Sequence, residues 1–68
     1  MYKILIIDDE ILIRELIKKS IDFNALGFEI VGEAKDGRQA MEMIEALHPN
    51  LLLLDINLHS AVFGWRHK

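Results

Sequence analysis

The feature that most constrains this chain is a run of four apolar residues that leads directly into three acids. Residues 4–7 are all isoleucine or leucine, and Asp8, Asp9 and Glu10 follow them. A segment that is apolar on both faces predicts a buried strand of a parallel sheet, because helices cover both faces of such a sheet. The acids would then lie at the carboxyl end of that strand, the edge at which open α/β sheets bind ligands. The alternative is a turn whose aspartate caps the next helix.

Apolar residues at helical spacing predict two helices, over residues 10–21 and over residues 36–47. Asp36, with Gln39 three positions later, resembles a capping box at the start of the second helix, and Pro49 disfavours helical geometry just beyond its end. The predicted buried stripe of the first helix comprises Ile13, Leu16, Ile17 and Ile21. Its opposite face, which we expect to be solvated, comprises Arg14, Glu15, Lys18 and Lys19.

Two further segments predict strands. Residues 28–34 are rich in strand-forming side chains but include two glutamates, which favours an edge strand, and Gly32 permits close packing or a bulge. Residues 51–54 are all leucine and end on Asp55, so they repeat the pattern of residues 4–8. The resulting order of strand, helix, strand, helix and strand predicts an α/β fold with parallel strands and right-handed crossovers.

The carboxyl ends of the first and third strands would meet if these two strands are neighbours. That arrangement requires the second strand on the other side of the first, which gives the strand order 2-1-3 and a switch point at which ligands bind. Asp8, Asp9 and Asp55 would then converge. Clustered carboxylates without histidine or cysteine favour Mg²⁺, and a carboxylate beside Mg²⁺ can act as the nucleophile in phosphoryl transfer. These considerations do not choose which aspartate is attacked.

Length and composition narrow the class of protein further. The 68 residues make at most one small domain. Their hydrophobic fraction of 51% is more than a soluble domain of this size needs, which indicates a surface buried against a partner or a piece of a larger protein. The chain has no cysteine, so disulfides and thiolate metal sites are excluded. A net charge of −3 argues against direct nucleic-acid binding. The apolar runs are too short for a membrane span or signal peptide, so we expect a cytoplasmic protein.

Several segments of the chain resemble the receiver domain of bacterial two-component response regulators. The matching segments are residues 4–10, 32–34, 36–37, 40 and 49–58. The resemblance implies a flavodoxin-like fold, here a truncated one, over residues 1–58. The middle region is most similar to receivers that are attached to AraC-type DNA-binding domains.

The resemblance also implies a role for each acid. Asp55 corresponds to the phosphoacceptor, and Asp9 to a direct Mg²⁺ ligand, with Asp8 nearby or acting through water. The backbone carbonyl of Asn57 corresponds to the third protein ligand of the metal. A partner histidine kinase would supply the phosphoryl group. We therefore do not expect the chain to be an enzyme. A hydrolase of the aspartyl-phosphate type would need a second aspartate two residues after its nucleophile, and neither Asp8 nor Asp55 is followed by one at that distance.

Residues 59–68 depart from the receiver pattern. Ser60 and Lys68 do not stand where receivers have the hydroxyl and the lysine that respond to the phosphoryl group, so we expect switching to be impaired. A shifted reading frame, a truncation or a cloning remnant would explain this tail, and an adapted segment that covers the sheet is the alternative. An exposed edge at residues 51–54 predicts self-association. A self-associating strand-helix protein with purely structural acids is therefore the second hypothesis.

Overall fold

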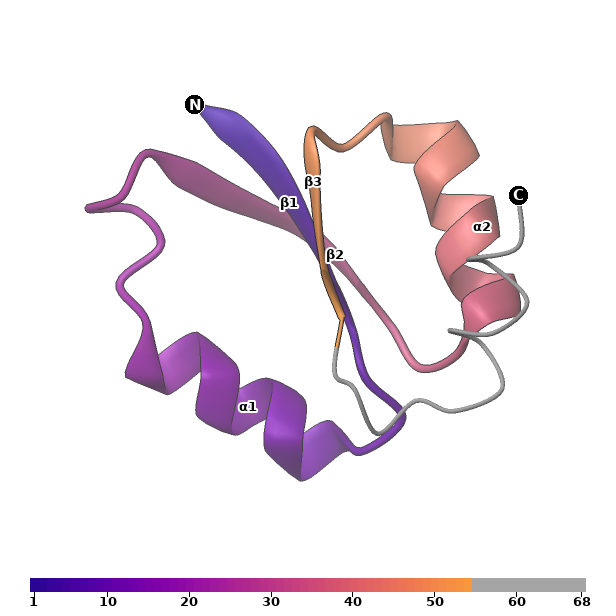
Figure 1. The fold of residues 1–68 in the computed structure, drawn as a ribbon, viewed down its shortest axis with the longest axis horizontal. Helices are drawn as coiled ribbons and strands as arrows, with labels where there is room; N and C mark the ends of the chain where they lie inside the picture. The colour runs from indigo at the N-terminus through magenta and orange to yellow at the C-terminus, as the bar shows by residue number, and fades with distance from the viewer. Residues whose placement is uncertain (55–68) are drawn as a thin grey trace.

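The computed structural model describes residues 1–54, which form a three-stranded sheet and two helices (Figure 1). None of the helices in this part of the chain is long and apolar enough to cross a membrane. Asp55, Asn57 and the predicted tail at residues 59–68 lie outside the described residues. The elements are, in chain order, β1 (Tyr2–Ile7), α1 (Ile11–Ser20), β2 (Phe28–Ala34), α2 (Gly37–Leu47) and β3 (Leu51–Leu54).

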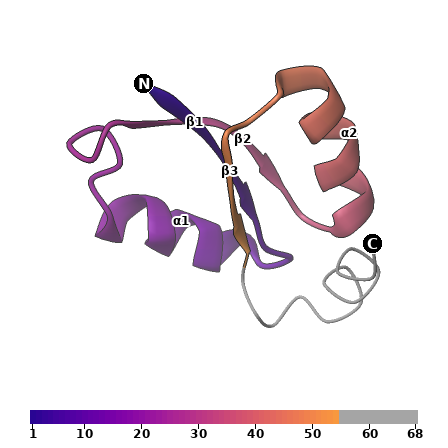
Figure 2. The same ribbon diagram turned by 45° about the horizontal axis from the view of Figure 1, so that its top comes forward.

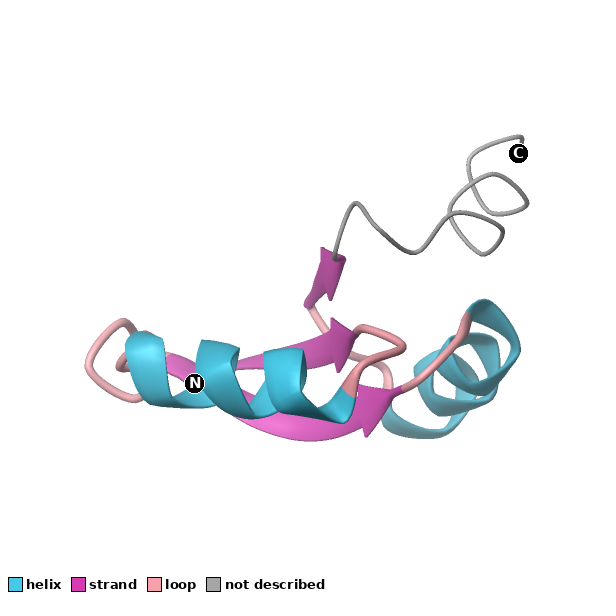
Figure 3. Ribbon diagram, turned by 90° about the horizontal axis from the view of Figure 1, so that it is seen from below, coloured by secondary structure: helices cyan, strands magenta, loops and turns pink. Residues whose placement is uncertain are grey.

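The three strands are parallel and have the order β2-β1-β3, as the sequence predicts (Figure 3). β1 is central because it pairs with β2 on one side and with β3 on the other. Its residues 4–7 are all buried, which fits a strand that is apolar on both faces. The predicted α/β architecture, the described part of a flavodoxin-like fold, is therefore confirmed.

The two helices cover opposite faces of the sheet (Figure 2). On one face, Leu5 and Ile7 of β1 pack with Ala40 and Ile44 of α2. On the other face, Ile4 and Ile6 pack with Phe23, which follows α1, and with Ile17 and other partly buried residues. Alternate residues of β1 thus serve different cores, because successive side chains of a strand point to opposite faces.

The predicted buried stripe of α1 is only partly correct. Ile17 packs against the core, but the side chains of Leu16 and Ile21 are 59% and 37% exposed. α1 has no fully buried residue. Helical spacing identifies which residues share a face, yet the burial of that face depends on how much surface the neighbouring elements offer.

The structure confirms three local predictions, for the start and the end of α2 and for Gly32 of β2. The carboxylate of Asp36 accepts a hydrogen bond from the backbone N–H of Gln39 at 2.8 Å, which caps α2. His48 adopts the left-handed conformation, with φ of 51°, just before Pro49 and ends the helix. On β2, the register shifts so that Leu5 pairs with Gly32, which is the bulge that a glycine in a strand favours.

Candidate functional site

The candidate site lies where β1 and β3 end side by side. The parallel register pairs Ile7 with Leu54. In the sequence, Asp8 directly follows Ile7, and Asp55 directly follows Leu54. Of the four predicted metal ligands, the described residues include Asp8 and Asp9.

Asp8 and Asp9 occupy very different environments. Asp8 is only 1% exposed, whereas Asp9 is exposed to solvent. The backbone N–H of Asp8 donates to the carbonyl oxygen of Ala34 at 3.0 Å, which extends the pairing between β1 and β2. The carboxylate of Asp8 accepts a hydrogen bond from the backbone N–H of Glu10 at 2.8 Å. This bond fixes the turn between β1 and α1, since an aspartate that bonds two residues ahead stabilises a tight turn.

The alternative reading, in which an aspartate caps α1, does not describe this turn. The residue at the N-cap of α1 is Glu10, and its side chain makes no capping hydrogen bond. Asp8 lies two residues before the cap and binds the cap residue's backbone. The side chain of Asp8 is therefore held at the edge of the sheet rather than on the first turn of the helix.

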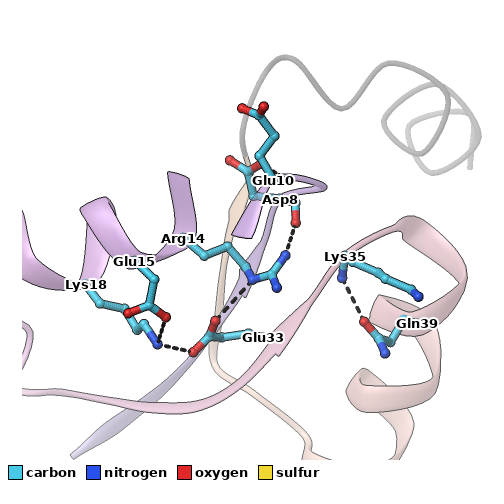
Figure 4. Close-up of polar contacts among 8 residues, drawn as sticks. All are labelled: Asp8, Glu10, Arg14, Glu15, Lys18, Glu33, Lys35 and Gln39. Atoms are coloured by element: carbon cyan, nitrogen blue, oxygen red, sulfur yellow. Dashed lines mark hydrogen bonds and ion pairs between the residues drawn. The ribbon is translucent and has the colours of Figure 1, made fainter. Parts of the chain in front are cut away.

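Arg14 of α1 contacts this turn, which the sequence analysis did not predict (Figure 4). Its Nη1 donates to the backbone carbonyl oxygen of Asp8 at 2.5 Å, and its Nε donates to a carboxylate oxygen of Glu33 on β2 at 3.1 Å. The side chain of Arg14 is only 13% exposed. The expectation that Arg14 lies on a solvated face is therefore wrong, because its guanidinium reaches across to β2.

Lys18, one helical turn after Arg14, completes a charged network (Figure 4). Its Nζ lies 2.6 Å from a carboxylate oxygen of Glu33 and 2.9 Å from one of Glu15. The hydrogen bond from Lys18 lowers the pKa of Glu33, and the bond to Glu33 raises the pKa of Lys18. Two cations and two carboxylates thus balance one another.

A signal for this network does exist in the sequence. Arg14 and Lys18 are four positions apart, so they lie on one face of the helix, and β2 carries Glu33 within an otherwise mostly apolar strand. What the sequence does not contain is the position of α1 over β2, since Arg14 and Glu33 are nineteen residues apart.

The chemistry of the acids suits a hard cation. Carboxylate and carbonyl oxygens are the ligands that Mg²⁺ prefers. Within residues 1–54, however, no three carboxylate or imidazole side chains gather closely enough to hold a metal ion. Two of the four predicted ligands, Asp55 and Asn57, follow Leu54 in the sequence.

Comparison with known proteins shows which family the chain is similar to. The family model of the response regulator receiver domain matches residues 4–65, which runs past the predicted boundary at residue 58. The REC domain of AraT, a response regulator from Geobacillus stearothermophilus, has a similar solved structure. The TM-score is 0.78 and the sequence identity is 35%, over 94% of this chain and 53% of that one.

Two curated proteins illustrate the range of relatives. The nitrate/nitrite response regulator protein NarL of Escherichia coli is 44% identical over 55 residues, which are 81% of this chain and 25% of NarL. A protein-glutamate methylesterase/protein-glutamine glutaminase of Pseudoalteromonas atlantica is 33% identical over 57 residues, which are 84% of this chain and 15% of that protein. The chain thus spans a quarter or less of the length of these two relatives.

Proposed function

Since this chain belongs to the receiver domain family of response regulators, we propose that it accepts a phosphoryl group on Asp55 from a partner histidine kinase. One observation supports this proposal above the others: β1 and β3 are adjacent and parallel, and they pair Ile7 with Leu54. The residues that follow these two in the sequence are the acids Asp8 and Asp55. A site built at this edge would occupy the switch point of the sheet.

We propose that Asp8, Asp9, Asp55 and the backbone carbonyl of Asn57 hold Mg²⁺ at this edge. The hard oxygen atoms of these groups fit that cation. When bound, Mg²⁺ would neutralise the negative charge of the phosphoryl oxygens during transfer. The burial of Asp8 supports this role, because a carboxylate in a place of low dielectric interacts more strongly with a cation.

In the proposed reaction, a carboxylate oxygen of Asp55 attacks the phosphorus atom of the donor. A new P–O bond forms, and the bond between phosphorus and the donor's nitrogen or oxygen breaks with its electron pair going to the leaving group. The leaving group takes up a proton from water, and an aspartyl phosphate results. Asp8 and Asp9 do not react, and their charges serve to hold the metal.

The experiment that tests this function is phosphorylation with a small phosphodonor in the presence of Mg²⁺. Mass spectrometry of the intact chain should detect the gain of one phosphoryl group, and the gain should disappear in Asp55→Ala and when Mg²⁺ is chelated. Asp36→Ala provides a matched control, since Asp36 caps α2 and lies outside the proposed site. Phosphorylation that persists in Asp55→Ala would refute the assignment of the phosphoacceptor.

We propose the same division of the chain as the sequence predicts. We assign the acidic site to residues 1–58 and treat residues 59–68 as a divergent tail. Ser60 and Lys68 do not stand at the positions of the hydroxyl and the lysine that respond to the phosphoryl group in receivers. We therefore expect these 68 residues to keep the same conformation when Asp55 is phosphorylated. Nearly identical amide NMR spectra outside the site, before and after phosphorylation, would support this view.

Self-association is a second candidate function, favoured by exposed apolar surface. Within residues 1–54, β3 pairs with a strand on one side only, and Leu51 of β3 is exposed. Such an edge can pair with another chain. On α1, the exposed apolar side chains are Ile11, Leu12 and Leu16. Analytical ultracentrifugation across a range of concentrations should reveal a dimer or larger species, and a monomer at all concentrations would exclude this function.

A further inference from the structure

Arg14 joins three parts of the molecule that meet at the acidic edge. It belongs to α1, it binds the Glu33 carboxylate on β2, and it donates to the backbone carbonyl oxygen of Asp8 in the turn after β1. Figure 4 shows its guanidinium between these two acceptors. The planar fork of an arginine presents several donors in fixed directions, so the two acceptors together fix the orientation of the group.

The bond to the Asp8 carbonyl matters because of where that carbonyl lies. The peptide unit between Asp8 and Asp9 is planar, so holding its oxygen atom fixes the plane and the N–H of Asp9 as well. The same turn is held a second time by the bond from the Glu10 N–H to the Asp8 carboxylate. Arg14 therefore constrains the direction in which the backbone leads the Asp9 side chain away from the strand.

From this geometry we infer that Arg14 is a positioning residue for the acidic site. By holding the Asp8 carbonyl, it keeps Asp8 and Asp9 in the arrangement that binds the divalent cation. The inference rests on the proposed Mg²⁺ site, and it concerns a residue that would not touch the metal. Groups that orient the ligands of a metal commonly change its affinity by about 10–100-fold when they are removed.

The sign of the effect separates positioning from simple electrostatics. Arg14 carries a positive charge close to a site for a cation, so its removal should tighten Mg²⁺ binding if charge alone mattered. A positioning role predicts the opposite, because the turn would lose the bond that orients it. Lys18 provides the comparison, since it carries the same charge and binds the same Glu33, but within residues 1–54 its side chain pairs with Glu15 and Glu33 rather than with the turn.

The test compares Arg14→Gln with Lys18→Gln in the full 68-residue chain. The Mg²⁺ dissociation constant is measured from the shift of the Asp9 amide signal during titration with MgCl₂. Arg14→Gln should weaken binding by about tenfold, whereas Lys18→Gln should leave it unchanged or make it slightly tighter. Arg14→Lys keeps the charge but offers a single donor group in place of the fork, so it should also weaken binding. This variant decides the matter if Arg14→Gln does not fold.

A second measurement does not depend on the metal. Hydrogen exchange of the Glu10 amide, without Mg²⁺, should be faster in Arg14→Gln than in Lys18→Gln, because the turn that protects this amide is no longer held. If the unchanged chain binds no Mg²⁺, the proposed metal site fails, and the exchange measurement alone tests the role of Arg14. Unchanged exchange at Glu10, or Mg²⁺ binding as tight in both Arg14 variants as in the original chain, would overturn the inference.

Discussion

At Gly32, side chains of β1 and α2 lie close to the backbone of β2, and a single added methyl group tests that packing. A Cβ at this position would lie 3.2 Å from Cδ1 of Leu5 on β1, 3.2 Å from Cδ1 of Leu47 and 3.3 Å from the sulfur of Met43, both on α2. The optimal separation between two non-bonded carbon atoms is about 3.5–4.0 Å. Gly32→Ala therefore requires side chains on two different elements to move by a few tenths of an ångström.

The expected cost follows from two opposing effects. Overpacking a well-filled core costs about 1–3 kcal/mol. Replacing glycine by alanine also restricts the unfolded chain, which stabilises the folded state by about 0.4–1 kcal/mol when the backbone conformation suits alanine. The difference leaves Gly32→Ala less stable by about 1 kcal/mol, which lowers the midpoint of thermal unfolding by about 4–8 °C in a domain of this size.

Urea unfolding followed by far-ultraviolet circular dichroism measures this difference. Leu47→Ala removes one of the contacting atoms, so the double variant should be more stable than the sum of the two single changes implies. Gly27→Ala is the matched control: nothing lies within 4 Å of its Cβ, but its φ of 87° makes alanine strained for a purely local reason. If Gly32→Ala equals or exceeds the stability of the original chain, the argument from close packing is refuted.

Three further changes test other interactions of the fold. Asp36→Ala removes the cap of α2 and should lower the unfolding free energy by about 1 kcal/mol in urea titration. Asn50→Ala removes the side-chain acceptor of the Lys3 backbone N–H at the start of β3, and a loss of about 0.5–1.5 kcal/mol is expected by the same assay. The hydrogen bond from Lys18 lowers the pKa of Glu33, so this ion pair contributes fully to the free energy of unfolding above the ordinary pKa of 4.5. The contribution should be lost as the pH falls through the lower pKa that Glu33 has in the folded protein. Glu33→Gln should flatten this acid limb, and an unchanged limb would contradict the contribution of this ion pair.

The central strand was predictable because its signal is local and strong. Four successive apolar residues can be satisfied only where both faces are covered, and residues 4–7 are buried on both faces. The order 2-1-3 was predicted on the condition that the first and third strands are neighbours, and the pairing of β1 with both β2 and β3 confirms it. The helix faces were less predictable, since Leu16 and Ile17 are neighbours in the same predicted stripe and only Ile17 packs against the core.

The candidate site was only partly predictable for a related reason. The position of Asp8 at the end of β1 follows from the sequence alone. Its contact with Arg14 does not, because that contact depends on how α1 lies across β2 and on a long side chain that folds toward the sheet. Charged residues on a helix usually face solvent. The spacing of Arg14 and Lys18 places them on one face, but it does not show that this face lies over Glu33, nineteen residues after Arg14.

The two helices differ in how far charged contacts add to their apolar packing on the sheet, and this difference has a functional consequence. α2 buries Ala40 against β1 and β2. α1 buries no residue completely: Ile17 packs against the core, and the bonds of Arg14 and Lys18 to Glu33 connect the helix to β2. The turn that carries the acids leads into α1. Loosening α2 should therefore lower the stability of the whole fold without altering the acids, whereas cutting the charged network should alter the acids first.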